Sequence, residues 1–389
     1  MIAFLDLAAD FSEVEADARR RIDTVLAKQQ FVLGAQTAEL ETRVREMSGA
    51  PAALACSSGS DALYLALVAL GIGPGDAVAV PGFTFFASAG AVARAGAQPV
   101  FCDIDPASFV AGGEQFEAAI GREFEGCAGQ LRHRRSGARL RALMPVHLYG
   151  RAAPMAQLAQ VAGARRLAII EDAAQAIGAT IDGRWVGRFG SVGCFSFYPT
   201  KNLGGAGDGG MLLTDDAATA ARLQRLRVHG ASASDPYLHR EVGINARMGE
   251  LQAAVLNAKL GHLAVWTERR RWVAARYLER LAPPARAGAL ILPQVAAESQ
   301  QVWHQFAVRV AERRDEVAAR MEADGVAVRV FYPRPLHLQP CFAELGYQTG
   351  DLPGCERAAQ QVLCLPIYPS LRADDVDRVC ESLIAALAG

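Results

Sequence analysis

The sequence predicts an α/β fold in which a mainly parallel sheet is covered by helices on both faces. From about residue 52, short apolar runs alternate with amphipathic segments. Short apolar runs bounded by turn residues are typical of buried strands, and helices between such strands favour parallel pairing. We expect strands over residues 52–56, 77–81, 98–103, 140–146, 167–171 and 192–197, with helices beginning near Asp61, Phe86 and Met155.

The pattern changes after about residue 265, which predicts a second, smaller α+β domain. Charged residues 13–47 predict one or two surface helices interrupted near residues 31–34, and residues 247–280 predict a long helical stretch. We expect residues 1–264 to form an N-terminal arm and a large domain, and residues 265–389 to form the small one. In the small domain we expect strands over residues 302–310 and 326–331, and helices over residues 312–323 and 374–388.

Composition excludes several classes of function. The formal net charge of -1, from 40 basic and 41 acidic residues, gives no basic excess for binding nucleic acid or an anionic membrane. The 8 cysteines form no C-x-x-C pair, so neither a zinc site nor a disulfide framework is predicted, and reduced thiols favour the cytoplasm. Asp6 and Asp10 stand where a signal peptide needs a basic start and an apolar run. Apolar residues 77–93 contain Pro81 and Gly82, which argues against a membrane span.

One lysine stands in a glycine-rich stretch, SFYPTKNLGGAGDGG (196–210). A lone loop lysine is usually solvated. Here apolar strand residues lead directly into Lys201, and the glycines after it allow the backbone to pass close to a bound group. A lysine held among apolar and backbone groups loses its charge more readily and can attack an aldehyde as a neutral amine. Lys201 is therefore the candidate nucleophile.

Two further motifs offer groups that could bind a ligand together with Lys201. In IIEDAAQAIG (169–178), Glu171 and Asp172 end an apolar strand, at the edge where parallel sheets place their ligands. A carboxylate there can pair with a protonated pyridine nitrogen, although a helix N-cap is an equally good interpretation. In CSSGSDAL (56–63), Gly59 and small hydroxyl residues can turn backbone N–H groups towards an anion. The second motif lacks the Rossmann glycines and the Walker lysine, so it predicts a phosphate site of another kind.

With these motifs in place, the chain resembles the DegT/StrS family of sugar aminotransferases, which have the type I fold of pyridoxal-phosphate enzymes. That resemblance implies a large domain with a mainly parallel seven-stranded sheet between helices, plus a smaller C-terminal α+β domain. It covers nearly the whole chain, and its motifs are LGIGPGDAV (70–78), PGFTFFA (81–87), PVHLYG (145–150), EDAAQAIGA (171–179), FSFYPTKNLGGAGDGG (195–210), GINARMGELQAAVL (243–256) and YPRPLHLQP (332–340).

The resemblance also implies a role for particular residues. Lys201 becomes the lysine that forms a Schiff base with pyridoxal 5'-phosphate, and Asp172 becomes the partner of the pyridine nitrogen. The other implied cofactor contacts are Gly59, Ser60 and Ser196 at the phosphate, Gln175 near the ring oxygen, Phe85 stacked on the ring, and Asn245 reaching the phosphate of the neighbouring subunit in a homodimer. Arg247, Tyr332 and His337 match positions near a nucleotide-sugar.

The implied reaction moves an amino group from L-glutamate, through pyridoxamine 5'-phosphate, to a nucleotide-linked keto-deoxysugar. The subgroup resembled favours a 3-keto over a 4-keto acceptor. An aminocyclitol aminotransferase and a non-catalytic regulatory protein that binds the cofactor remain alternatives. Three residues depart from the family pattern: Ser60 stands where threonine is usual, Gly249 where aspartate is frequent, and Phe331 where histidine is frequent. Residues 121–139 are expected to form an exposed loop, within which residues 122–138 look like an insertion.

Overall fold

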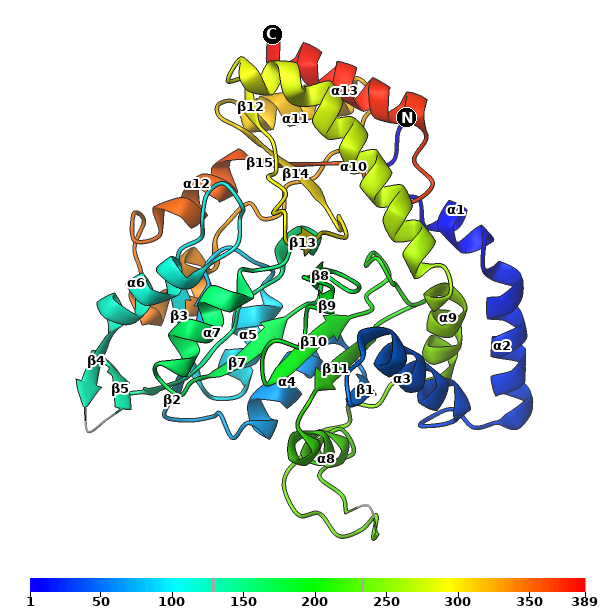
Figure 1. The fold of residues 1–389 in the computed structure, drawn as a ribbon, viewed down its shortest axis with the longest axis vertical. Helices are drawn as coiled ribbons and strands as arrows, with labels where there is room; N and C mark the ends of the chain where they lie inside the picture. Colours follow the sequence, from blue (N-terminus) through cyan, green and yellow to red (C-terminus); the bar gives the residue numbers. More distant parts are fainter. Residues whose placement is uncertain (128–129, 233, 389) are drawn as a thin grey trace.

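A mixed sheet forms the centre of the molecule in this computed structural model, which describes residues 1–127, 130–232 and 234–388 (Figure 1). Its strand order is β1-β11-β10-β7-β6-β2-β3, and the hairpin β4–β5 joins it through β6. Strands β10, β7, β6, β2 and β3 pair in parallel, whereas β11 is antiparallel to both of its neighbours. The strands are β1 (Ala52–Cys56), β2 (Asp76–Pro81), β3 (Gln98–Cys102), β4 (Phe124–Cys127), β5 (Gln130–His133), β6 (Arg139–Leu143), β7 (Ala168–Asp172), β10 (Val192–Ser196) and β11 (Gly210–Thr214).

All six strands expected in the large domain are confirmed, and a seventh, β11, was missed. Every residue of β11 is buried, but its apolar run, Met211–Leu213, is only three residues long, which is shorter than the runs that indicate a buried strand. Its first residue, Gly210, is also the last residue of the glycine-rich stretch, so the start of the strand could not be recognised. The close approach of β11 explains one glycine there: a Cβ on Gly210 would lie 2.4 Å from the backbone oxygen of Ser58.

Helices cover the sheet in two groups, which lie in front of it and behind it in Figure 1. In one group α4 packs against α5 and α8, and in the other α6 packs against α7. Apolar side chains from these helices and from the strands share one large buried cluster. The bounds are α4 (Gly59–Ala69), α5 (Ala87–Arg94), α6 (Gly113–Glu123), α7 (Met155–Gly163), α8 (Ala217–Leu226) and the 3-10 turn η1 (Leu148–Gly150).

The N-terminal arm packs against the middle of the chain through a buried carboxylate. Glu250, at the start of α9, accepts hydrogen bonds from the backbone N–H groups of Gly34, Gln36 and Thr37 at 2.9, 2.8 and 3.0 Å. These groups open α3, where a helix has no partners of its own for its N–H groups, so Glu250 supplies the cap. The helices are α1 (Leu7–Ser12), α2 (Glu15–Lys28), α3 (Ala35–Ser48) and α9 (Glu250–Leu260). The expected interruption near residues 31–34 is confirmed.

A second sheet, β12-β14-β15, carries its own buried cluster in the C-terminal part of the chain. The expected stretch over residues 247–280 is two helices, separated at Gly261 between α9 and α10. Helix α10 begins close to residue 265, which we keep as the proposed domain boundary. The elements are α10 (Leu263–Arg286), β12 (Leu290–Ile291), β14 (Phe306–Val310), α11 (Arg314–Ala323), η2 (Leu336–Leu338), η3 (Pro340–Leu345), α12 (Pro353–Gln361), β15 (Val362–Leu365) and α13 (Ala373–Ala388).

Two local expectations are wrong. Residues 326–331 form no strand: Val326 makes an isolated bridge with Ile2 and Arg329 makes one with Cys364, so the segment contacts two different neighbours in turn. Residues 121–139 are not an exposed loop, because they contain the hairpin β4–β5, in which His133 is buried. Residues 128 and 129 of this segment lie outside the described part.

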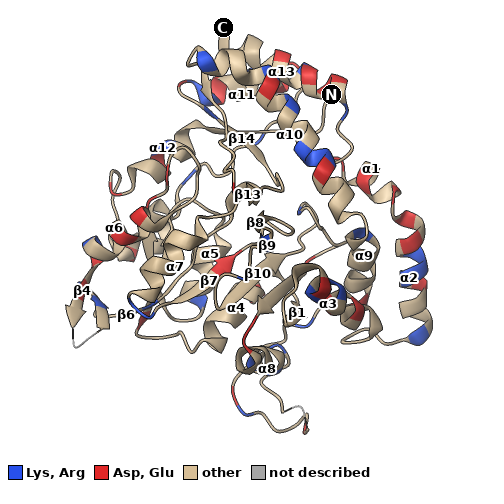
Figure 2. Ribbon diagram, viewed as in Figure 1, with Lys and Arg blue, Asp and Glu red and all other residues tan. Residues whose placement is uncertain are grey.

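Figure 2 shows acidic and basic residues interspersed along α2 and α10. Among the described residues, no helix combines the length and the apolar character that crossing a membrane requires.

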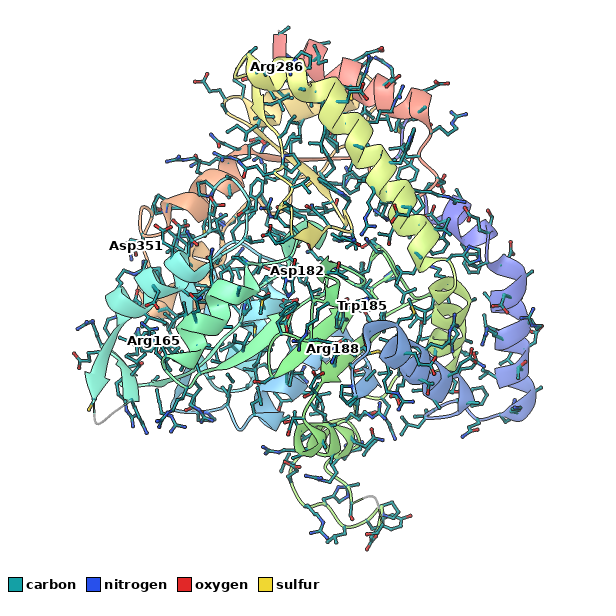
Figure 3. The ribbon with its side chains drawn as sticks, viewed as in Figure 1. Arg165, Asp182, Trp185, Arg188, Arg286 and Asp351 are labelled. Carbon is teal, nitrogen blue, oxygen red and sulfur yellow. The ribbon has the colours of Figure 1, made fainter. Side chains whose placement is uncertain are left out.

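A small third sheet, β13-β8-β9, includes Trp185, which Figure 3 labels together with Asp182 and Arg188. Its strands are β8 (Thr180–Ile181), β9 (Arg184–Trp185) and β13 (Ser299–Gln300).

Candidate active site

A cavity of about 540 Å³ lies at the carboxyl ends of β7 and β10. This is the edge at which parallel sheets place their ligands, because loops from successive strands meet there. Two segments of the C-terminal part, around His304 and Tyr332, also reach the cavity. Of the eleven predicted site residues, eight line it: Gly59, Ser60, Phe85, Asp172, Gln175, Ser196, Lys201 and Tyr332.

Lys201 follows β10 in a tight loop. Its backbone N–H donates to the carbonyl of Tyr198 at 2.8 Å, and the N–H of Gly205 donates to Phe197 at 2.8 Å. Gly204 is required by this turn, since a Cβ there would lie 2.1 Å from the carbonyl oxygen of Pro199. The absence of a side chain at Gly204 therefore allows the backbone of Pro199 to lie close to it. Burial lowers the pKa of Lys201 to about 8, against the opposing charge of Asp172.

Asp172 ends β7 and is buried. Ser88 donates its hydroxyl to Oδ2 at 2.6 Å, and the N–H of Ala174 donates to Oδ1 at 3.1 Å. Burial raises the pKa of Asp172, while the Ser88 hydroxyl, the Ala174 N–H and Lys201 oppose that rise. A cationic group in the cavity would stabilise the carboxylate further. The bond to Ser88 was missed, because this serine stands in an apolar helix where its sequence position gives no signal.

The phosphate end of the cavity is formed at the start of α4. The side chain of Ser58 caps this helix by accepting from the N–H of Asp61 at 3.0 Å. The first N–H groups of the helix, which include those of Gly59 and Ser60, have no partners within it and suit an anion. Ser196 faces them from the end of β10: a Cβ on Gly59 would lie 2.6 Å from Cβ of Ser196. The three motifs predicted from sequence therefore meet in one cavity.

Gln175 is held on the cavity wall by two hydrogen bonds. Its Oε1 accepts from the backbone N–H of Tyr149 at 2.7 Å, and its Nε2 donates to the hydroxyl of Tyr332 at 3.1 Å. Tyr149 also lines the cavity, where its hydroxyl donates to the carbonyl of Phe331. Phe85 lies on the same wall, with its ring centroid 6.0 Å from that of Tyr332.

His304 and Gln305 line the cavity and were not predicted. Nδ1 of His304 lies 3.2 Å from Oδ1 of Asn202, the residue after the candidate nucleophile. Burial lowers the pKa of His304 well below its usual value, and the positive charge of Lys201 contributes to the shift. His304 stands just before β14, and nothing in its local sequence indicates the contact with Asn202.

Three predicted residues do not line the cavity: Asn245, Arg247 and His337. Asn245 is exposed and accepts a hydrogen bond from Nε of Arg247 at 2.9 Å. His337 is buried elsewhere, with Nε2 3.1 Å from Oε1 of Glu356. The structure therefore places His337 in a packed pair and away from the candidate site.

The residues present fit pyridoxal phosphate. The cavity offers a lysine of lowered pKa, a carboxylate with remaining acceptor capacity and an N-terminal helix turn that a Cβ at position 59 would obstruct. Within the described residues, no group of three or more His, Cys, Asp or Glu side chains is arranged to hold a metal ion. The donor set thus matches a phosphorylated, aldehyde-bearing pyridine.

Comparison with known proteins finds relatives over nearly the whole chain. The chain is 42% identical over 382 residues to the pleiotropic regulatory protein of Geobacillus stearothermophilus, covering 98% of this chain and 97% of the relative. It is 41% identical over 388 residues to the UDP-N-acetyl-3-dehydro-alpha-D-glucosamine 3-aminotransferase of Acidithiobacillus ferrooxidans, covering 100% and 98%. The structure of NtdA from Bacillus subtilis with bound cofactor PMP superposes with a TM-score of 0.89 at 30% identity, over 100% of this chain and 85% of that one.

A family model extends the agreement along the chain. The model for the DegT/DnrJ/EryC1/StrS aminotransferase family matches residues 12–384, from the N-terminal arm to the last helix. Both the cofactor cradle and this match point the same way: the chain belongs to the DegT/DnrJ/EryC1/StrS family of pyridoxal-phosphate-dependent aminotransferases.

Proposed function

We propose that this protein moves an amino group from L-glutamate to a nucleotide-linked keto-deoxysugar, with a 3-keto acceptor favoured over a 4-keto one. The observation that carries the proposal is the meeting of Lys201, Asp172 and the start of α4 in one cavity. The relative from Acidithiobacillus ferrooxidans, named for a 3-dehydro sugar nucleotide, supports the acceptor class. We also propose that the reaction takes place in the cytoplasm.

The chain's own residues would hold the cofactor at five points. Asp172 would pair with the ring nitrogen, and Gly59, Ser60 and Ser196 would hold the phosphate. Phe85 would stack on the ring, and Gln175 would contact the ring oxygen with the second hydrogen of its amide. Lys201 would hold the aldehyde between turnovers. When bound, pyridoxal phosphate supplies an electron sink that stabilises negative charge at a neighbouring carbon.

Lys201 is the proton carrier of this proposal. Once its amine is free, Nζ would take the proton from the α-carbon of the amino donor as a general base and would donate it, as a general acid, to the carbon that carried the aldehyde. A pKa of about 8 leaves part of the lysine neutral near pH 7, which a base requires. Asp172 keeps the site's positive charge localised at the ring nitrogen, and the oxo acid product leaves before the sugar is aminated.

We further propose that two subunits share each site, with Asn245 reaching the neighbour's phosphate. Its exposure outside the cavity of its own subunit supports this proposal. Lys201→Ala and Asn245→Ala should each lose most activity alone. Mixed and reassembled, they should regain roughly a quarter of native activity, because half of randomly formed dimers contain one intact site. A mixture no more active than its parts, or a fully active monomer, would contradict shared sites.

The decisive experiment combines a panel of keto-sugar nucleotides with glutamate and identifies the products by mass spectrometry. We expect amination of at least one 3-keto sugar nucleotide, and a visible cofactor band that disappears in Lys201→Ala. Lys28→Ala, the same substitution on the exposed face of α2, should keep both. If the holoenzyme aminates no member of the panel while glutamate still converts its cofactor, the proposed acceptor class is wrong.

A further inference from the structure

Two tyrosines line the cavity, and their hydroxyl groups are used differently. The hydroxyl of Tyr149 donates to the carbonyl oxygen of Phe331, so its one hydrogen is occupied within the chain. The hydroxyl of Tyr332 instead accepts a hydrogen bond, from Nε2 of Gln175 at 3.1 Å. A phenol has one hydrogen to donate and can accept at the same time. The bond from Gln175 therefore does not use the hydroxyl hydrogen of Tyr332, which is still available to donate.

The orientation of the Gln175 amide is determined by the backbone of Tyr149. A backbone N–H can only donate, and that of Tyr149 lies 2.7 Å from the Gln175 side chain. The oxygen of the amide must face this donor. The nitrogen must then face Tyr332, since turning the amide over would place its NH2 group against the N–H of Tyr149. Gln175 consequently donates to Tyr332 and cannot accept from it.

The surroundings of Tyr332 leave the cavity as the direction for its hydroxyl hydrogen. The ring is flanked by Phe83 and Phe85, with centroids 6.2 and 6.0 Å away, and neither offers an oxygen. Among the residues that the structure describes, the one hydrogen bond of this hydroxyl is the bond it accepts from Gln175, and it donates none. Tyr332 itself lines the cavity. Burial also raises its pKa, so the hydroxyl keeps its hydrogen throughout the physiological range.

We propose that Gln175 is a positioning residue that turns the hydroxyl of Tyr332 into a hydrogen-bond donor, directed at an oxygen of the sugar substrate. This inference rests on the proposed function, because it takes the keto-sugar nucleotide as the ligand. Carbonyl, ring and phosphate oxygens of such a sugar are acceptors and match a donor at this point. The same hydroxyl turned the other way would present a lone pair and repel them.

The test separates the two half-reactions by single-turnover absorbance of the cofactor. Tyr332→Phe should lower kcat/KM for the keto-sugar nucleotide by about 10–100-fold, the effect of one lost hydrogen bond in a buried site. Reaction of the same variant with glutamate should change by less than about threefold. Retention of the visible cofactor band shows that the variant is folded and loaded.

Gln175→Glu makes the positioning role specific. A carboxylate at position 175 still accepts from the N–H of Tyr149, but it also accepts the hydroxyl of Tyr332 and turns that hydrogen away from the sugar. We expect a loss close to that of Tyr332→Phe above the pKa of the new carboxyl. Below that pKa the carboxyl donates as the amide does, so activity towards the sugar should return, relative to the glutamate half-reaction. Tyr332→Phe should show no such return.

A control and a double variant complete the experiment. The charged side chains that line the cavity, Asp172, Lys201 and Asp208, are the same in all variants. Gln301→Glu places the same change at a buried residue outside the cavity lining and should show no acid recovery. Gln175→Glu combined with Tyr332→Phe should be no worse towards the sugar, relative to glutamate, than Tyr332→Phe alone, because both remove one interaction.

Several outcomes would overturn the inference. They are an unchanged sugar half-reaction in Tyr332→Phe, additive losses in the double variant, or no acid recovery in Gln175→Glu. If Gln175→Glu does not retain the cofactor, Gln175→Met removes the same donor without adding a charge. It is then compared, alone and combined with Tyr332→Phe, in the same two half-reactions. If the wild-type protein aminates no keto-sugar nucleotide, the proposed function fails first; if it does and the variants do not discriminate, only the role of Gln175 fails.

Discussion

Two adjacent carboxylates end β7 and have different surroundings. Glu171 accepts from the backbone N–H groups of Gly187, Phe189 and Gly190, each at 2.6 Å, and from Nε2 of His147 at 3.0 Å. Nδ1 of His147 accepts from a backbone N–H, which requires its Nε2 to be the donor. A carboxylate offers about four lone-pair sites, so Glu171 is saturated by its own chain.

Asp172 points to the other side of the strand, as successive residues do. Its only donors among the described residues are Ser88 and the N–H of Ala174, which leaves acceptor capacity open in the cavity. Both carboxylates are buried, and neither burial nor sequence position separates them. What separates them is whether the chain has already filled their lone pairs, and this identifies the one available to a ligand.

The largest expected effect follows from replacing the unsaturated carboxylate. Asp172→Asn should lower transamination by about 10²–10³-fold, because the charge facing the ring nitrogen is lost. Unfolding of the cofactor-free protein in urea should be unchanged or slightly harder, since burial already raises the pKa of this carboxyl and disfavours its charged form. A large loss of stability in the cofactor-free variant would mean that Asp172 is structural, as Glu171 is.

The second prediction concerns pH. Cofactor uptake by the cofactor-free protein requires neutral Lys201, whose pKa is about 8. The initial rate of recovery of the visible band should therefore rise roughly 50-fold between pH 6 and pH 8 and then level off. The negative charge of Asp172 raises this pKa, so the midpoint should move to lower pH in Asp172→Asn. It should stay in place in Glu171→Gln, and equal shifts in both variants would contradict the comparison.

Replacing the saturated carboxylate should affect stability. Glu171→Gln places an amide NH2 among four converging donors, so one or more of them loses its acceptor. We expect the free energy of unfolding to fall by about 2–3 kcal/mol, measured by urea denaturation of the cofactor-free protein. The activity of the protein that remains folded should change little. A loss of turnover without a loss of stability would show that the two carboxylates do not divide their roles in this way.

The smallest effect is expected at Ser88. Ser88→Ala removes one donor to Asp172, worth about 1 kcal/mol, and should lower transamination by roughly fivefold. Loss of this donor should also raise the pKa of Asp172 further, because the bond favours the charged form. Activity should then fall at a higher pH than in the wild type when the solution is acidified. Thr84 lines the cavity, and its hydroxyl lies 3.3 Å from that of Ser88 without bonding Asp172, so Thr84→Ala is the matched control for a lost hydroxyl.

Much of the fold could be predicted because its signals are local. The six expected strands are short apolar runs, and the glycine or polar residues that bound them stand next to them in sequence. β11 was missed because its apolar run, Met211–Leu213, is only three residues long. Residues 326–331 were assigned to a strand because their composition suits one, while strand pairing depends on distant neighbours. Their actual partners, Ile2 and Cys364, are far away in sequence.

The candidate site divides in the same way. Lys201, Asp172 and Gly59 were recognised from motifs, and the structure brings them together, although their catalytic roles remain proposals. His337 was expected near the sugar on the same grounds and instead pairs with Glu356. His304 and Gln305 were missed, because residues that reach a cavity from another part of the chain leave no mark in their local sequence.

By itself, therefore, the sequence determined the class of fold, the family and the chemistry expected of Lys201, since all three depend on residue types at fixed local spacing. Only the tertiary structure decided which of two neighbouring carboxylates is left unsaturated, and in which direction the hydroxyl of Tyr332 points. Those properties depend on donors contributed by residues 187–190, by Ser88 and by Gln175, which reach their partners only after folding. Hydrogen bonds are directional and short, so their distribution cannot be read from order along the chain.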